Sequence, residues 1–232
     1  MTSPMRSEVT RLHLGGFRAP EAYGPNERLV VNGWLVRHPE ATILVDTGIA
    51  PNIPPADMEH LRFLRVPVIE ALASLNVVPE AIDLVINCHL HADHAGGNAD
   101  IPRARILVQP AELAAARQPD YSLPDAIDLE GGRYDERDGE HEPLPGVRVI
   151  PTPGHSPGHQ SVLLETTRGR LLLAGQIYRD ASGFGRAVTA RELAREGHTD
   201  AADTPSWLPY LLELGADRIA FGHDRAVWAA DA

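Results

Sequence analysis

Eight short apolar runs, rich in β-branched residues and leucine, recur along the chain and predict β-strands. Several of them are apolar throughout, as expected of strands buried on both faces. The runs cover residues 28–36, 41–48, 82–87, 105–109, 147–152, 161–166, 170–175 and 217–222.

Helical spacing of apolar residues appears over 66–75, 110–117 and 205–215. Pro110 suits the first turn of the second helix, and Gly215 suits the end of the third. Strands and helices alternate in both halves of the sequence. The pattern therefore predicts an α/β fold with helices packed outside sheets.

The segment 118–146 departs from this alternation, because it is acidic and is broken by proline and glycine. We expect a surface excursion there, with a lid over an active site as the alternative. The chain has 232 residues, of which 43% are hydrophobic. That is enough for a sizeable core, and residues 1–232 are expected to form a single domain.

Composition excludes several classes of function. The formal charge of −11 disfavours nucleic acid, whose phosphates bind basic groups. All 21 basic residues are arginines, so lysine nucleophiles are ruled out. No apolar run of about 18 residues predicts a membrane span, and the N-terminal residues do not resemble a secretory signal. A single cysteine, Cys88, fits a reducing compartment, and we expect a cytoplasmic protein.

Histidines gather at three predicted strand ends. "NCHLHADHAGGN" (87–98) carries His89, His91, Asp93 and His94, while "TPGHSPGHQS" carries His155 and His159 and "FGHD" carries His223. A lone histidine is usually a capping or core residue, but this cluster would be costly without a cation. Imidazole and carboxylate are ligands that zinc accepts, and the chain has enough of them for two metal sites.

Neighbouring residues have simpler interpretations. Cys88 is expected to be a small buried residue beside the site. His159 is interpreted as a structural or outer residue rather than a ligand. Gly96 and Gly97 fit a backbone that passes close to the cluster or turns sharply.

The "HLHADH" motif has the H-x-H-x-D-H form of the metallo-β-lactamase superfamily. Together with "ILVDTG", "TPGHSPGHQS" and "FGHD", it resembles the N-acyl homoserine lactonases, the quorum-quenching members of that superfamily, over residues 28 to 224. The resemblance implies a four-layer αββα sandwich in which Asp46 steadies a metal ligand, although Asp46 could instead cap a turn. It also implies two metal sites, one formed by His89, His91 and His155 and the other by Asp93, His94 and His223.

Three positions differ from the lactonase pattern. Gln176 stands where the family has an aspartate that bridges both metals, and a neutral amide is a poor bridge between dications. The second metal should therefore bind more weakly, with the three-histidine site surviving. Tyr178 lies one residue nearer to this position than the family's substrate-binding tyrosine, so it is either catalytic or structural. Ala92 replaces a bulky aromatic residue, which predicts a wider pocket.

The resemblance implies a metal-dependent hydrolase that opens a lactone or other ester-like small molecule by attack of metal-bound hydroxide. Asp93 would pass a proton to the departing alkoxide. One or two zinc ions are expected, and iron, cobalt or manganese could replace them. A thioesterase of the glyoxalase II kind is one alternative. A weakened or non-hydrolytic binding or biosynthetic protein, marked by Gln176, is another. A homodimer could use Trp207 or Trp228, although ordinary packing is the simpler role for these side chains.

Overall fold

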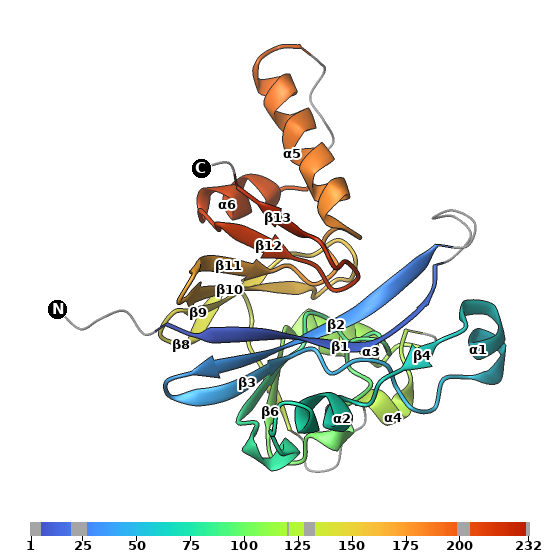
Figure 1. Cartoon of the computed structure of the whole chain (residues 1–232). Helices are drawn as coiled ribbons and strands as arrows, with labels where there is room; N and C mark the ends of the chain where they lie inside the picture. Colours follow the sequence, from blue (N-terminus) through green and yellow to red (C-terminus); the bar gives the residue numbers. More distant parts are fainter. Residues whose placement is uncertain (1–5, 20–26, 120, 128–132, 199–204, 231–232) are drawn as a thin grey trace.

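The computed structural model contains two β-sheets that lie face to face, with helices on their outer sides (Figure 1). It describes residues 6–19, 27–119, 121–127, 133–198 and 205–230. The sheets come from successive parts of the chain, since residues up to 136 form one sheet and residues from 141 form the other.

The first sheet has seven strands. Its N-terminal strands pair antiparallel, and β3, β5, β6 and β7 then run parallel. In spatial order the strands are β4 (Leu64–Arg65), β1 (Glu8–Arg18), β2 (Arg28–His38), β3 (Ala41–Val45), β5 (Leu84–Ile86), β6 (Arg105–Val108) and β7 (Tyr134–Glu136).

The second sheet has six strands. Its pairs are antiparallel except for β11 and β12, which run parallel and are connected through two helices. In spatial order the strands are β13 (Val227–Ala229), β12 (Arg218–Ala220), β11 (Gly169–Leu173), β10 (Gln160–Thr166), β9 (Val147–Pro151) and β8 (His141–Leu144).

A dry core holds the two sheets together. Val36, Ile43 and Ile86 on the first sheet and Val149 and Val162 on the second belong to one cluster and are fully buried. Burying apolar surface between two sheets is the main favourable contribution to such a sandwich. Inward-facing side chains on both sheets therefore explain the apolar runs of the sequence.

Helices cover the outer faces. α1 (Pro55–Leu61), α2 (Val68–Ala73), α3 (Pro110–Ala116) and α4 (Pro124–Ile127) lie beside the first sheet, with short 3₁₀ turns η2 (Pro79–Ala81) and η3 (Asn98–Asp100). α5 (Ala181–Arg195) and α6 (Leu208–Glu213) lie beside the second. Leu72 and Leu113 pack in the first outer cluster, and Phe184 and Leu211 in the second. The order helix, sheet, sheet, helix confirms the expected αββα architecture.

All eight predicted strands and all three predicted helices are present, with ends that differ by a few residues. β1 and α5 were not anticipated. In β1, Gly15 and Gly16 interrupt the alternation of apolar and polar side chains, and the pairing of β1 with β2 shifts register between His13 and Gly15. α5 has 15 residues but buries only Phe184 and Val188, so its sequence lacks an apolar stripe.

The described residues of the segment 118–146 include regular elements, and its role as a surface excursion or a lid stays a prediction. α4 packs Ala126 and Ile127 into the core, while β7 and β8 extend the edges of the two sheets. Edge strands need few apolar residues, so the acidic composition concealed them. Residues 120 and 128–132 lie outside the described residues.

Trp207 and Trp228 pack against the cluster of α5 and α6, and the indole N–H of Trp207 donates to the Pro153 carbonyl oxygen. Ordinary packing therefore accounts for both side chains. Among the described residues, no helix combines the length and the apolar character that crossing a bilayer requires.

Candidate metal centre

The first candidate site, called the three-histidine group, consists of His89, His91 and His155. The Nε2 atom of His89 lies 3.0 Å from Nδ1 of His91. Nε2 of His155 lies 3.2 Å from each of these nitrogen atoms. Three ring nitrogens therefore converge on one point, from two separate loops.

The second candidate site, called the aspartate group, consists of Asp93, His94 and His223. The Nε2 atoms of His94 and His223 are 3.1 Å apart. Oδ2 of Asp93 lies 3.4 Å from Nε2 of His223 and 3.7 Å from Nε2 of His94. In each group, the ligand atoms all lie within 4.8 Å of one another.

Both sheets contribute ligands to both groups. The loop after β5 carries His89, His91, Asp93 and His94, whereas His155 follows β9 and His223 follows β12. Strand ends on a rigid sandwich hold such loops in place, so side chains far apart in sequence meet at one edge. All six ligand residues that the resemblance implied are brought together in the expected two sets.

The donor sets fit divalent cations. A neutral imidazole carries only one N–H, so three ring nitrogens facing one another cannot all satisfy each other by hydrogen bonding. A catalytic zinc ion is usually held by three protein ligands, and its fourth coordination position is open to water or substrate. Three converging lone pairs meet this requirement. The geometry therefore supports two metal sites on chemical grounds.

Outer contacts orient the ligands of the aspartate group. Nδ1 of His94 donates to Oδ2 of Asp46 at 2.8 Å, and Oδ1 of Asp46 accepts the Cys88 amide at 2.8 Å. Nδ1 of His223 donates to the Val30 carbonyl oxygen at 2.8 Å. Asp46 is fully buried, with a left-handed backbone at φ 58° that aspartate tolerates. Its contacts agree with the role of steadying a ligand.

The environment shifts the pKa of the histidines in opposite directions. Burial lowers the pKa of His89 well below its usual value, and it lowers the pKa of His155 to about 4. Burial also opposes charge on His94, but Asp46 and Asp93 outweigh it and raise the pKa of His94 to about 9. In the metal-free chain, the histidines of the three-histidine group are therefore neutral at pH 7, whereas His94 is doubly protonated and positively charged.

Asp93 is ionised at neutral pH. Burial would raise the pKa of its carboxyl group, but the nearby imidazoles of His94 and His223 outweigh that effect and lower it. In the metal-free chain, the carboxylate of Asp93 and the protonated imidazole of His94 therefore carry opposite charges.

Close backbone approach explains two glycines of the loop. A Cβ atom on Gly96 would lie 1.9 Å from the Ala50 amide nitrogen, and one on Gly97 would lie 2.5 Å from the Thr47 carbonyl oxygen. The loop that carries four of the ligands is thus pressed against the segment after β3, as the sequence predicted.

His159 supports the segment after β11. Its Nε2 accepts the Gln176 amide at 3.0 Å, so Nδ1 carries the proton and donates to the Thr152 hydroxyl at 2.9 Å. Both ring nitrogens are engaged, which agrees with a structural role. The side chain of Gln176 interacts with His94, so this residue lies at the aspartate group.

Tyr178 points into the packing around α5. Its ring lies 5.6 Å from that of Phe184 and 6.2 Å from that of Trp207. The tyrosine that contacts a metal-site histidine is Tyr121, whose ring centroid is 4.7 Å from that of His91. Sequence analysis missed Tyr121 because it lies in the segment interpreted as a surface excursion.

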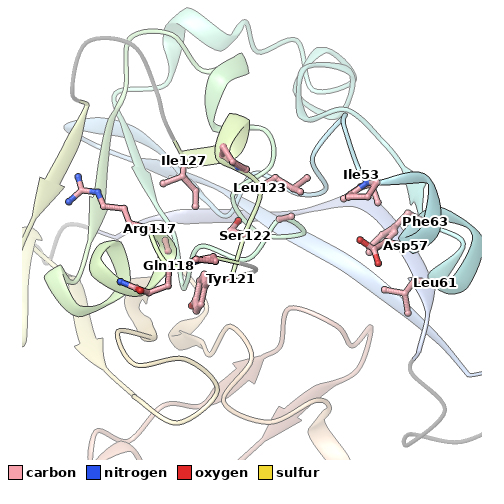
Figure 2. Close-up of a pocket in the computed structure, with 15 residues that line it drawn as sticks. Ile53, Asp57, Leu61, Phe63, Arg117, Gln118, Tyr121, Ser122, Leu123 and Ile127 are labelled. Atoms are coloured by element: carbon pink, nitrogen blue, oxygen red, sulfur yellow. The ribbon is translucent and has the colours of Figure 1, made fainter.

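Figure 2 shows a cavity of about 880 Å³, whose lining includes Tyr121, the residue that contacts His91. Ile53, Leu61 and Phe63 lie on one side of it, and Tyr121 and the nearby Leu123 and Ile127 lie on the other. Ala92, between the ligands His91 and Asp93, is also part of the wall. The cavity therefore borders the loop that carries His91 and Asp93 at a position with a very small side chain, and the wider pocket expected from the sequence stays a prediction.

Residues 26–223 match the family model of the metallo-beta-lactamase superfamily. The chain belongs to this superfamily. The match covers both ligand groups, and the resemblance inferred from the histidine motifs is confirmed.

Curated relatives of this superfamily member are N-acyl homoserine lactonases. The protein from Bacillus cereus is 35% identical over 60% of this chain and 60% of its own length. AiiA from Bacillus thuringiensis subsp. kurstaki is 33% identical over 66% of each chain. These alignments span less than two thirds of either relative. AttM of Azorhizobium caulinodans is 24% identical over 97% of this chain and 93% of its own.

Solved structures of the superfamily match nearly the whole chain. An AiiA mutant with N-decanoyl-L-homoserine at the active site has a TM-score of 0.73 and 26% identity, covering 96% of this chain and 95% of AiiA. An N-acyl homoserine lactone hydrolase with N-hexanoyl-L-homoserine at its catalytic metal centre has a TM-score of 0.71 and 27% identity, with the same coverage.

Proposed function

We propose that this chain is a metal-dependent hydrolase that opens the ring of a small lactone bearing an apolar chain. The observation that carries the proposal is that two ligand groups share the loop around Ala92 with a cavity of about 880 Å³, whose walls are largely apolar. Its lactonase relatives, among them one with a hydrolysis product at its metal centre, support the same reaction.

The proposed cofactor is zinc, as one or two ions held by the three-histidine group and the aspartate group. Iron, cobalt and manganese accept the same ligands. When bound, such an ion polarises a carbonyl group and acidifies water, so ester cleavage needs no side-chain nucleophile.

Asp93 is the proposed proton carrier. Its carboxyl group is ionised at neutral pH, so the oxygen atom that does not bind the metal could accept a proton released from water. Passing that proton to the departing ring oxygen completes the addition of water, which converts the lactone to a hydroxy acid. The proposed part played by Tyr178 rests on family resemblance, and removing its hydroxyl group in Tyr178→Phe tests it.

The cavity favours a substrate with an apolar extension. Ile53, Leu61, Phe63 and Leu123 give it apolar walls, and its volume is in the range of small-molecule sites. Because Ala92 does not narrow the entrance, we expect Ala92→Phe to reduce activity on long-chain lactones more than on short-chain lactones.

A second candidate is a weakened or non-hydrolytic protein that binds a lactone-like metabolite. Gln176 favours it, since this amide brings no charge to the aspartate group and so leaves a second dication poorly compensated. We infer that the chain holds one metal tightly and a second one weakly.

The test combines elemental analysis with a substrate panel. Protein purified without added metal should contain close to one metal ion per chain. Two tightly held ions would contradict the inferred difference between the sites. The metal-loaded protein is then offered lactones of graded chain length and acyl thioesters. Faster hydrolysis of lactones than of thioesters supports the proposal. Faster hydrolysis of thioesters would contradict it and indicate a thioesterase. Tight lactone binding without turnover supports the second candidate.

A further inference from the structure

Glu112 is a buried carboxylate outside both ligand groups. It lies in α3 and is 1% exposed. Its Oε1 accepts the Leu90 amide at 2.8 Å and the Tyr121 hydroxyl, while Oε2 accepts the Ser156 hydroxyl at 2.6 Å and the Gly158 amide at 3.1 Å. Four donors from three separate segments therefore converge on one side chain.

Those donors flank the ligands of the three-histidine group. Leu90 lies between His89 and His91, and Ser156 directly follows His155. The second loop is pressed against α3, since a Cβ atom on Gly158 would lie 2.2 Å from the amide nitrogen of Glu112. Glu112 thus connects the two loops whose nitrogens must converge within 3.2 Å.

The three-histidine group has no anionic ligand of its own. A dication bound there would keep its full charge in a buried place, where uncompensated charge is costly. In the described part of the chain, all hydrogen bonds to Glu112 come from uncharged groups. Its negative charge is therefore not cancelled by a hydrogen-bonded cation, and it favours positive charge at the position of His91.

We propose that Glu112 is the positioning residue and the buried counter-charge of the three-histidine group, which fixes the spacing of its nitrogens and raises its affinity for a divalent cation. This inference rests on the metal dependence in the proposed function but not on any particular substrate. Tyr121 extends the network to the cavity, because its hydroxyl group donates to Glu112 while its ring contacts His91.

The experiment measures zinc affinity by chelator competition on metal-free protein, without substrate. A His223→Ala parent retains only the three-histidine group, and a His155→Ala parent retains only the aspartate group. Glu112→Gln, which removes the charge at nearly constant shape, should weaken binding about 10- to 100-fold in the first parent, the usual effect of losing an outer partner. In the second parent, the change should stay below about threefold.

Two further variants separate charge from packing. Tyr121→Phe removes one donor but keeps the carboxylate, so its affinity should stay within about threefold of the parent. Glu112→Asp keeps the charge and should recover part of the affinity lost in Glu112→Gln. If Glu112→Gln does not fold, as judged by circular dichroism, Ser156→Ala in the His223→Ala parent takes its place. That variant removes the bond to Oε2 from the residue that directly follows His155, so it should weaken zinc binding several-fold and more than Tyr121→Phe does.

Two results would overturn the inference. One is that Glu112→Gln leaves zinc affinity unchanged in the His223→Ala parent. The other is that Glu112→Gln lowers zinc affinity equally in both parents, which is what a general structural role would produce. No zinc binding at all in the His223→Ala parent would overturn the proposed metal site together with this inference. Absence of lactone hydrolysis with normal zinc binding would overturn the proposed substrate alone.

Discussion

His94 is held between two carboxylates, with Asp46 bonded to its Nδ1 atom and Asp93 near its Nε2 atom. The bond to Asp46 orients the ring so that Nε2 faces His223. Outer hydrogen bonds of this kind fix imidazole ligands and increase their basicity. Asp46 should therefore influence metal affinity although both of its oxygens are engaged by protein groups.

Asp46→Asn is expected to weaken metal binding at the aspartate group about 10- to 100-fold. The reason is that an amide carries no charge and supports His94 less well than a carboxylate does. Cobalt titration of metal-free protein, followed by visible absorption, measures the loss. Asp83→Asn is the control, since Asp83 accepts the Thr42 amide at the other end of β3. Equal affinity for Asp46→Asn and the control would contradict the assigned role.

Gln176→Asp is expected to bring the metal content close to two ions per chain and to increase lactone hydrolysis. The new carboxylate would lie beside His94 and lower the net positive charge of the centre by one unit. Elemental analysis and a hydrolysis assay give the two readouts. Gln176→Asn has the same shorter length without charge, so an equal gain in that variant would show that charge is not the cause.

At the scale of single residues, the sequence allowed the six candidate ligand residues to be recognised, because their motifs in three loops are specific. Glu112 and Tyr121 could not be recognised. Glu112 resembles any acidic residue in the first turn of a helix, and only the fold shows that it is buried. Tyr178 was considered for catalysis from its position along the chain, whereas its ring packs against Phe184.

Among the elements, α5 has 15 residues but buries only two side chains, so its N-terminal cap is a larger part of what stabilises it than core packing alone would suggest. The carboxylate of Asp180 accepts the Gly183 amide at 2.6 Å. Burial opposes charge on Asp180, but the bonds from Gly183 and Arg179 outweigh it and lower its pKa. Such a cap contributes about 1 kcal/mol to stability.

Asp180→Ala should lower the melting temperature at pH 7 by roughly 2–4 °C, as about 1 kcal/mol does in a chain of this size. Because the folded pKa lies below the ordinary aspartate value of about 3.9, the cap stabilises fully above that pH. Its contribution is lost as the pH falls through the folded pKa. The difference from wild type should therefore persist at pH 5 and shrink at pH 3 in thermal melts of metal-free protein. A pH-independent difference, or an equal loss in Asp180→Asn, would contradict the capping role.

Elements with strong apolar periodicity were predictable, and those held by local contacts were not. The strands of the central cluster bury nearly every side chain, so composition alone indicated them. β7 and β8 each lie at a sheet edge, and neither buries a residue fully, so no apolar pattern was required of them.

In the whole molecule, the metal centre connects the two sheets, because each ligand group contains residues from both halves of the chain. A ligand that binds only the folded state stabilises it, by about 4 kcal/mol at a thousand times its dissociation constant. Metal binding should therefore strengthen the contact between the sheets.

Removal of metal by a chelator is expected to lower the melting temperature by roughly 8–16 °C, from about 4 kcal/mol at 2–4 °C per kcal/mol. Differential scanning calorimetry measures the shift, and chelator already saturated with zinc is the control. The same melting temperature with and without free chelator would show that the folded chain gains no stability from metal.

The distribution of ligands along the chain also sets an order for biosynthesis. On the ribosome, all residues of the three-histidine group are present once His155 has emerged, but the aspartate group must wait for β10, β11, α5, α6 and β12 before His223 is made. A prematurely terminated product can therefore contain every residue of the first group while lacking one of the second. Loading of the aspartate group thus distinguishes finished chains from truncated ones, and it could serve as a maturation marker during expression.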